Sequence, residues 1–137
     1  MFLNLLTDRQ KQSFLALATK VVMADGEVVP EENVTLKVRA AEMGGGVKAP
    51  PDEIYGAPNF DVFDTPQSRT IVILELMVIA YSDDEYHEDE RPIIDDFIKK
   101  FGFTDDEVAR FEKWAMRQSP LSVEGWDFIS KSGSVDG

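Results

Sequence analysis

A short acidic motif occurs twice in the chain, each time in the same sequence context. The first copy spans residues 23–32 (MADGEVVPEE) and the second spans residues 81–90 (YSDDEYHEDE). The second copy follows the first by 58 residues, so that Asp83 aligns with Asp25. Each copy comes after an apolar stretch and before a helical pattern that ends at a glycine. A repeat at a fixed offset predicts duplicated supersecondary units, which limits the chain to folds built from two similar halves.

Apolar periodicity predicts a helix before each motif. From Phe14 to Val21, apolar residues recur at i, i+3, i+4 and i+7, which is one face of a helix. The apolar run 71–81 contains Leu76, which the offset of 58 residues aligns with Ala18 in the first half. That run begins with β-branched residues, as a strand would, but its length and its alignment favour a buried central helix. Glu75 in its middle then needs a partner or a path to water.

Local signals mark the helix ends and the connection between the two halves. Thr7, Thr65 and Thr104 each predict a helix N-cap, and Pro66 suits the first helical position. Residues 44–65 are rich in glycine and proline yet contain several aromatic side chains, so we expect an ordered connection with one helical turn over residues 51–55.

These patterns together predict an all-α fold. We expect a single-domain helical bundle of two repeated helix-turn-helix hairpins followed by C-terminal helices. The domain is expected to span residues 1–131, with residues 132–137 as a flexible tail.

Composition restricts the partners. A net charge of −12 argues against binding to nucleic acid or to an anionic membrane surface. The absence of cysteine fits a reducing compartment and excludes thiolate chemistry. We expect no signal peptide and no membrane insertion, since the longest apolar run is far shorter than a bilayer requires. A cytoplasmic location is therefore expected, while the oligomeric state and the identity of any protein partner stay open.

Both motifs also carry a family resemblance. An apolar helix ends in Ala24-Asp25-Gly26, and a glutamate, Glu32, opens the next helix; Ser82-Asp83-Asp84 and Glu90 repeat the pattern. This pattern resembles the tellurite-resistance protein B (TerB-like) family. The resemblance covers residues 2–117 and includes the opening residues 2–6, the helix over residues 69–80 and the closing glycines Gly44 and Gly102.

The resemblance implies an all-α domain of two helical hairpins, an association with resistance to tellurite and other stresses, and acidic residues that hold a metal ion. It implies no established enzymatic activity. Two features depart from the family pattern: Asp84 replaces a glycine, and the connection over residues 44–65 is longer than a minimal one.

The acidic turns are the candidate metal site. The candidate ligands are Asp25, Glu27, Glu31 and Glu32 in the first turn, and Asp83, Asp84, Glu85, Asp89 and Glu90 in the second. Calcium or magnesium, rather than zinc, would suit such oxygen ligands. The same residues can instead cap the helices that flank the turns, so both interpretations stay open. An EF-hand is excluded, because Val21 and Met23 occupy the first two ligand positions of its loop.

An enzyme is not expected. His87 is the only histidine, and the chain has no phosphate-binding glycine loop and no activated nucleophile. The alternative function is a metal-free helical adaptor for another protein. Tyr55, Phe60 and Phe63 in the connection would then contact the partner, together with the acidic surface.

Overall fold

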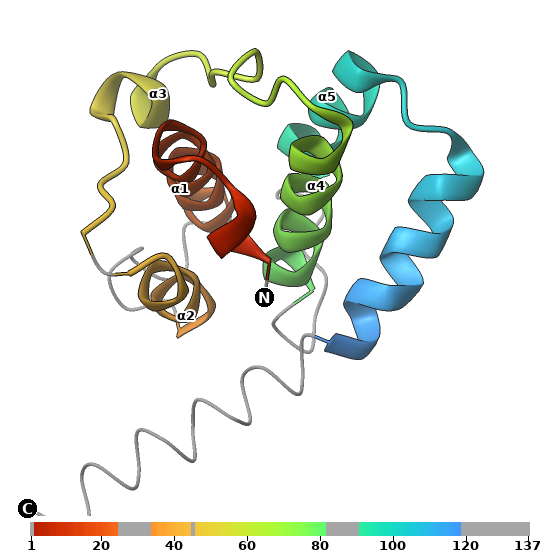
Figure 1. Ribbon diagram of the computed structural model, residues 1–137. Helices are drawn as coiled ribbons and strands as arrows, with labels where there is room; N and C mark the ends of the chain where they lie inside the picture. The colour runs from red at the N-terminus through yellow and green to blue at the C-terminus, as the bar shows by residue number, and fades with distance from the viewer. Residues whose placement is uncertain (1, 25–33, 45, 82–90, 119–137) are drawn as a thin grey trace, which may run out of the picture.

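The computed structural model describes residues 2–24, 34–44, 46–81 and 91–118, and all regular elements in these ranges are helices (Figure 1). The elements are η1 (Leu3–Leu5), α1 (Asp8–Met23), α2 (Val34–Glu42), α3 (Pro51–Tyr55), α4 (Pro66–Ala80), α5 (Arg91–Phe101) and a helix over residues 105–118. The all-α prediction is thereby confirmed for this part of the chain. None of these helices has the length and apolar character needed to cross a membrane.

The two longest apolar helices form the centre. α1 and α4 pack against each other, with α2 and α3 against α1 and α5 against α4 (Figure 1). The helix over residues 105–118 lies beyond α4, where the ring of Trp114 lies 6.0 Å from that of Phe2. The other helices therefore surround the central pair, with α2 and α3 mainly on α1 and α5 mainly on α4.

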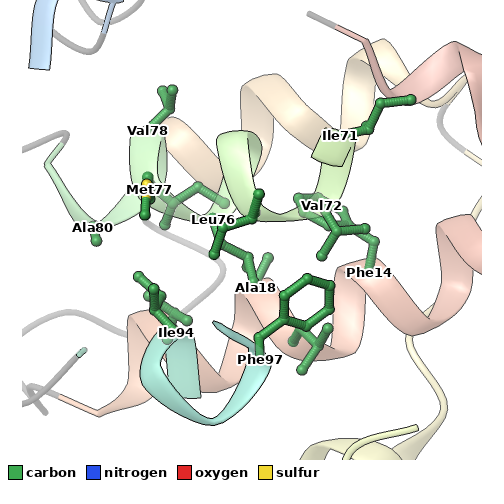
Figure 2. Close-up of a cluster of buried hydrophobic side chains, with 14 of the residues drawn as sticks. Phe14, Ala18, Ile71, Val72, Leu76, Met77, Val78, Ala80, Ile94 and Phe97 are labelled. Carbon is green, nitrogen blue, oxygen red and sulfur yellow. The ribbon is translucent and has the colours of Figure 1, made fainter. Parts of the chain in front are cut away.

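α4 is buried almost all round, which explains its uniformly apolar sequence. Val72, Leu76 and Met77 have no exposed surface, and neither do Phe14 and Ala18 on α1 (Figure 2). The predicted central helix is confirmed. Its β-branched residues adopt a helix because burial on every face outweighs a weak local preference for strand.

Side-chain caps begin three helices as predicted. The backbone amide of Gln10 donates to Thr7 Oγ1 at 3.2 Å. In return, the backbone amide of Thr7 donates to Gln10 Oε1 at 3.0 Å. Thr65 forms the same reciprocal pair with Ser68, and Pro66 occupies the first helical position. The third pair joins Thr104 and Glu107.

Two glycines end helices by a left-handed turn. Gly44 follows α2 with φ of 99°, and Gly102 follows α5 with φ of 72°. This region favours glycine because other residues place a Cβ against the backbone.

The connection between α2 and α4 is held by side chains of the helices that it crosses. Gln10 donates to the carbonyl of Val62 at 3.1 Å, and Lys20 donates to that of Gly56 at 2.7 Å. The connection contains α3, which is the helical turn that residues 51–55 predict. A segment rich in glycine and proline is therefore ordered through long-range contacts rather than through its own regular structure.

The final part of the connection packs into an aromatic cluster. Phe97 on α5 has no exposed surface and meets Phe60 edge-on at a centroid distance of 5.3 Å. Phe63 and Phe101 contact the same ring at 5.9 and 4.8 Å. Edge-to-face pairs of this kind add to the gain from burial.

We expect Phe97→Ala to lower the free energy of unfolding by about 3–5 kcal/mol, since it leaves a cavity among three rings. Urea unfolding followed by circular dichroism measures this loss. Met116→Ala is the control, because Met116 is 57% exposed and its truncation should cost about 0.5 kcal/mol or less. Equal losses in the two variants would contradict a core centred on Phe97.

Candidate functional site

The predicted cation ligands lie outside the described residues. This holds for Asp25, Glu27, Glu31, Glu32, Asp83, Asp84, Glu85, Asp89, Glu90 and also for His87. The structure does describe the helices on either side of the motifs: α1 and α2 flank the first, and α4 and α5 flank the second.

The two helices that lead into the motifs run in the same direction. From Phe14 to Ala18 on α1 and from Val72 to Ala80 on α4, both chains cross the view of Figure 2 the same way. Figure 1 agrees, since the C-terminal ends of both helices lie toward the same end of the molecule. The chain therefore enters both acidic motifs from one end of the central pair.

Both helices keep their hydrogen bonding to the last described residue before the motif. The Ala24 amide donates to the carbonyl of Lys20 at 3.1 Å, and the Tyr81 amide donates to that of Met77 at 3.0 Å. The position from which each motif starts is therefore set by a regular helix end.

No second candidate for a metal centre is present in the described ranges. Among those residues, no three His, Cys, Asp or Glu side chains come together in a way that could hold an ion.

A buried ion pair lies between α2 and α4. Arg39 Nε is 2.6 Å from Glu75 Oε2, and their side chains are 1% and 0% exposed. The backbone amide of Phe2 donates to Glu75 Oε1 at 3.1 Å. The expectation that Glu75 needs a partner is confirmed, but the sequence did not identify Arg39, which belongs to a different helix and half of the chain.

The geometry of this pair indicates a structural role. Arg39 Nε contacts the carboxylate closely without the alignment of a hydrogen bond, and Nη2 has no hydrogen-bond partner in the described part of the structure. Neither side chain reaches solvent, so no substrate in solution can touch them. The pair instead fixes α2 and the N-terminal segment against α4.

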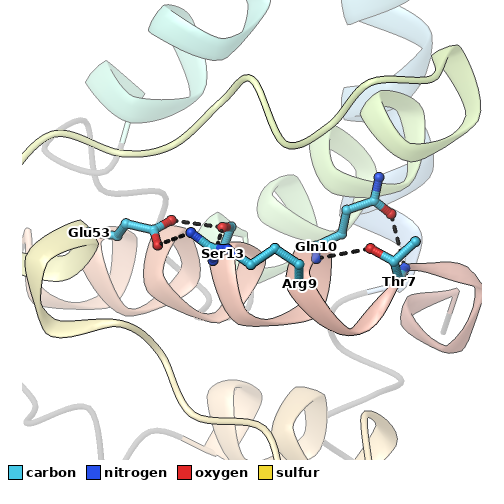
Figure 3. A network of polar contacts seen from close by, with 5 residues as sticks. All are labelled: Thr7, Arg9, Gln10, Ser13 and Glu53. Atoms are coloured by element: carbon cyan, nitrogen blue, oxygen red, sulfur yellow. Dashed lines mark hydrogen bonds and ion pairs between the residues drawn. The ribbon is translucent and has the colours of Figure 1, made fainter.

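A second polar network joins α1 to α3 (Figure 3). Ser13 Oγ donates to Glu53 Oε1 at 2.7 Å, and Arg9 Nη2 lies 2.7 Å from Glu53 Oε2. Arg9 Nη1 also donates to Ser13 Oγ at 2.8 Å. The contacts of Ser13 and Arg9 with Glu53 anchor α3 to α1. Glu53 lies 40 residues from Ser13, and no local pattern pointed to their contact.

The cap formed by Thr104 and Glu107 lowers the pKa of the Glu107 carboxylate. The amide and the hydroxyl of Thr104 both donate to Glu107 Oε1, at 3.0 and 3.1 Å. These bonds, with the amide bond the larger cause, lower the pKa of Glu107 below its ordinary value, because they stabilise the charged form.

The three aromatic residues of the predicted partner surface have different environments. Tyr55 is 78% exposed, whereas Phe63 has no exposed surface. Phe60 is partly buried against Phe97 and Phe101. Phe60 and Phe63 thus pack in the protein's own core, and of the three only Tyr55 is exposed to solvent.

Comparison of the chain with protein-family models, with curated proteins and with solved structures finds no match in any of the three.

Loss of one member of the Arg39–Glu75 pair should be costly. We expect Glu75→Ala to lower the free energy of unfolding by about 3–5 kcal/mol, because it leaves a buried guanidinium without its counter-charge. Replacing both residues, as in Arg39→Met with Glu75→Leu, should cost less than the single change. Urea unfolding of the three proteins measures the difference.

The control for this comparison is an exposed pair. Asp106 lies 3.1 Å from Arg110 on the surface, so Asp106→Ala should change stability little. A Glu75→Ala variant as stable as Asp106→Ala would contradict the structural role of the buried pair.

Proposed function

We propose that this chain is a non-enzymatic TerB-like protein whose two acidic inter-helix turns bind a divalent cation in resistance to tellurite or a related stress. The observation that carries the proposal is the common direction of α1 and α4, which brings the chain into both acidic motifs from one end of the molecule. Carboxylates from both turns are then available to one ion or to two neighbouring ions.

The connections of the helices support the same arrangement. α1 contacts α2 and α4 contacts α5, so each motif joins two helices that pack on each other. This is the arrangement expected of two repeated helix-turn-helix hairpins. Core positions related by the offset are also buried alike, since Ala18 and Leu76 both have no exposed surface.

The chemistry of the turns favours a hard cation. Four carboxylates in the first motif and six in the second repel one another, and a divalent ion relieves that repulsion. Calcium and magnesium prefer such oxygen ligands. The TerB-like resemblance of the same motifs supplies the connection to tellurite and other stresses, and Asp84 in place of the family glycine adds one charge to the second turn.

An alternative proposal is a metal-free adaptor that uses the 44–65 segment and the acidic surface. The observation in its favour is the exposure of Tyr55, whose ring is 78% accessible at the end of α3. Aromatic rings exposed on a rigid scaffold are frequent anchors of protein interfaces.

The metal proposal predicts selective stabilisation of the folded state. A thermal-shift titration with calcium, magnesium, manganese and zinc, each against excess EDTA, should give a saturable rise of several degrees with one hard cation. Asp25→Asn combined with Asp83→Asn should abolish the rise, because one ligand is lost from each turn. An unchanged melting temperature with all four ions would leave the acidic residues as helix caps.

The matched control removes two charges elsewhere. Asp105→Asn with Asp106→Asn makes the same change in net charge at exposed positions in the first turn of the 105–118 helix. This variant should keep the full response to the cation. Loss of the response in this variant too would indicate a general effect of acidity instead of a site in the turns.

A further inference from the structure

A groove lies between α1, α2 and α3. Leu15 and Thr19 of α1, Leu36 and Ala40 of α2, and Ile54 of α3 line it. Its volume is about 670 Å³, which is within the range of known binding sites. α2 and α3 both flank α1 in Figure 1.

The lining is mostly apolar, with one threonine and two lysines as its polar residues. Leu15, Ala40 and Ile54 are half-buried, so their side chains are open to an incoming group. The Thr19 hydroxyl already donates to the carbonyl of Leu15 at 2.7 Å. Specific small-molecule sites usually contain several fixed polar groups, and this groove is instead suited to aliphatic side chains.

Two lysines line the groove beside its apolar residues. Lys37 on α2 and Lys48 before α3 are both exposed. No Asp or Glu is among the described residues that line the groove. In a chain with 26 acidic residues and 14 basic ones, two ammonium groups at one groove give it a local positive charge.

We propose that this groove binds a short amphipathic helix of a partner protein whose aliphatic face is flanked by carboxylates. The aliphatic side chains would contact Leu15, Ala40 and Ile54, and the carboxylates would pair with Lys37 and Lys48. Binding of an amphipathic helix in an apolar groove is a recurring mode of peptide recognition. The charge of the lysines selects the acidic flank, while the acid excess of the remaining surface repels a longer acidic tract. None of the residues that line the groove belongs to the acidic turns, and the proposal does not depend on cation binding.

The test uses three fluorescein-labelled helical peptides of about 18 residues, long enough for five helical turns. They share leucines at i, i+3, i+4 and i+7, and their flanking residues are glutamate, glutamine or lysine. Fluorescence anisotropy should give the tightest dissociation constant for the glutamate peptide and the weakest for the lysine peptide. Lys37→Glu with Lys48→Glu should weaken the glutamate peptide at least tenfold and reverse the order.

The control variant has the same net charge. Lys99→Glu with Lys113→Glu changes exposed lysines on α5 and on the 105–118 helix, across the molecule from the groove. It should change the dissociation constant of the glutamate peptide less than twofold. Circular dichroism of both variants verifies that they are folded, and amide chemical shifts of Leu15, Ala40 and Ile54 locate the bound peptide.

Three outcomes would overturn the proposal. One is the absence of saturable binding by the glutamate peptide, and another is equal binding of all three peptides. The third is a dimer of the wild-type protein in sedimentation without peptide, together with a monomer for the Lys37→Glu, Lys48→Glu variant. The groove would then be an interface between two copies of this chain. None of these outcomes bears on the cation response, which is measured without peptide.

Discussion

One pair of charges without access to water holds three segments of this protein together. Glu75 on α4 contacts the Arg39 guanidinium of α2 and accepts from the backbone amide of Phe2. Burying two charges costs free energy, which their mutual contact and the hydrogen bond from Phe2 help to offset. Apolar packing is non-directional, whereas this contact requires one rotation and one height of α2 relative to α4. The pair thus adds specificity to a core that is otherwise uniformly apolar.

The connection between the two halves depends on a similar division of roles. Phe60 and Phe63 supply its apolar contacts, while Ser13, Lys20 and Gln10 of α1 bind its polar groups. A chain without regular hydrogen bonding must satisfy its carbonyls elsewhere, and α1 provides several of the donors. This explains how a segment of so much glycine and proline is ordered between two helices.

Local chemistry allowed much of the fold to be predicted. The three threonine caps, the helical turn at residues 51–55 and the helix ends at Gly44 and Gly102 follow from neighbouring residues, and all are confirmed. The burial of α4 required a longer argument, because its β-branched start favours a strand. The length of this segment and its alignment with α1 predicted a helix instead, and this prediction is confirmed.

Contacts between distant residues could not be predicted in the same way. The sequence indicated that Glu75 needs a partner, but any of several basic residues could have met it. Nothing near Glu53 pointed to Ser13. From sequence alone, apolar residues such as Phe60 and Phe63 could belong either to the core or to an interface. Their packing against Phe97 in the structure shows that they belong to the core. The acidic turns lie outside the described residues, so the cation site stays a prediction.

The shared direction of α1 and α4 has an electrostatic consequence for the end where both helices finish. The aligned peptide groups of each helix give its C-terminal end a partial negative charge of roughly half an electron. Because both ends point the same way, these two partial charges add where the chain enters the acidic motifs. The backbone of the central pair therefore contributes to a negative potential at this end, independently of any carboxylate side chain.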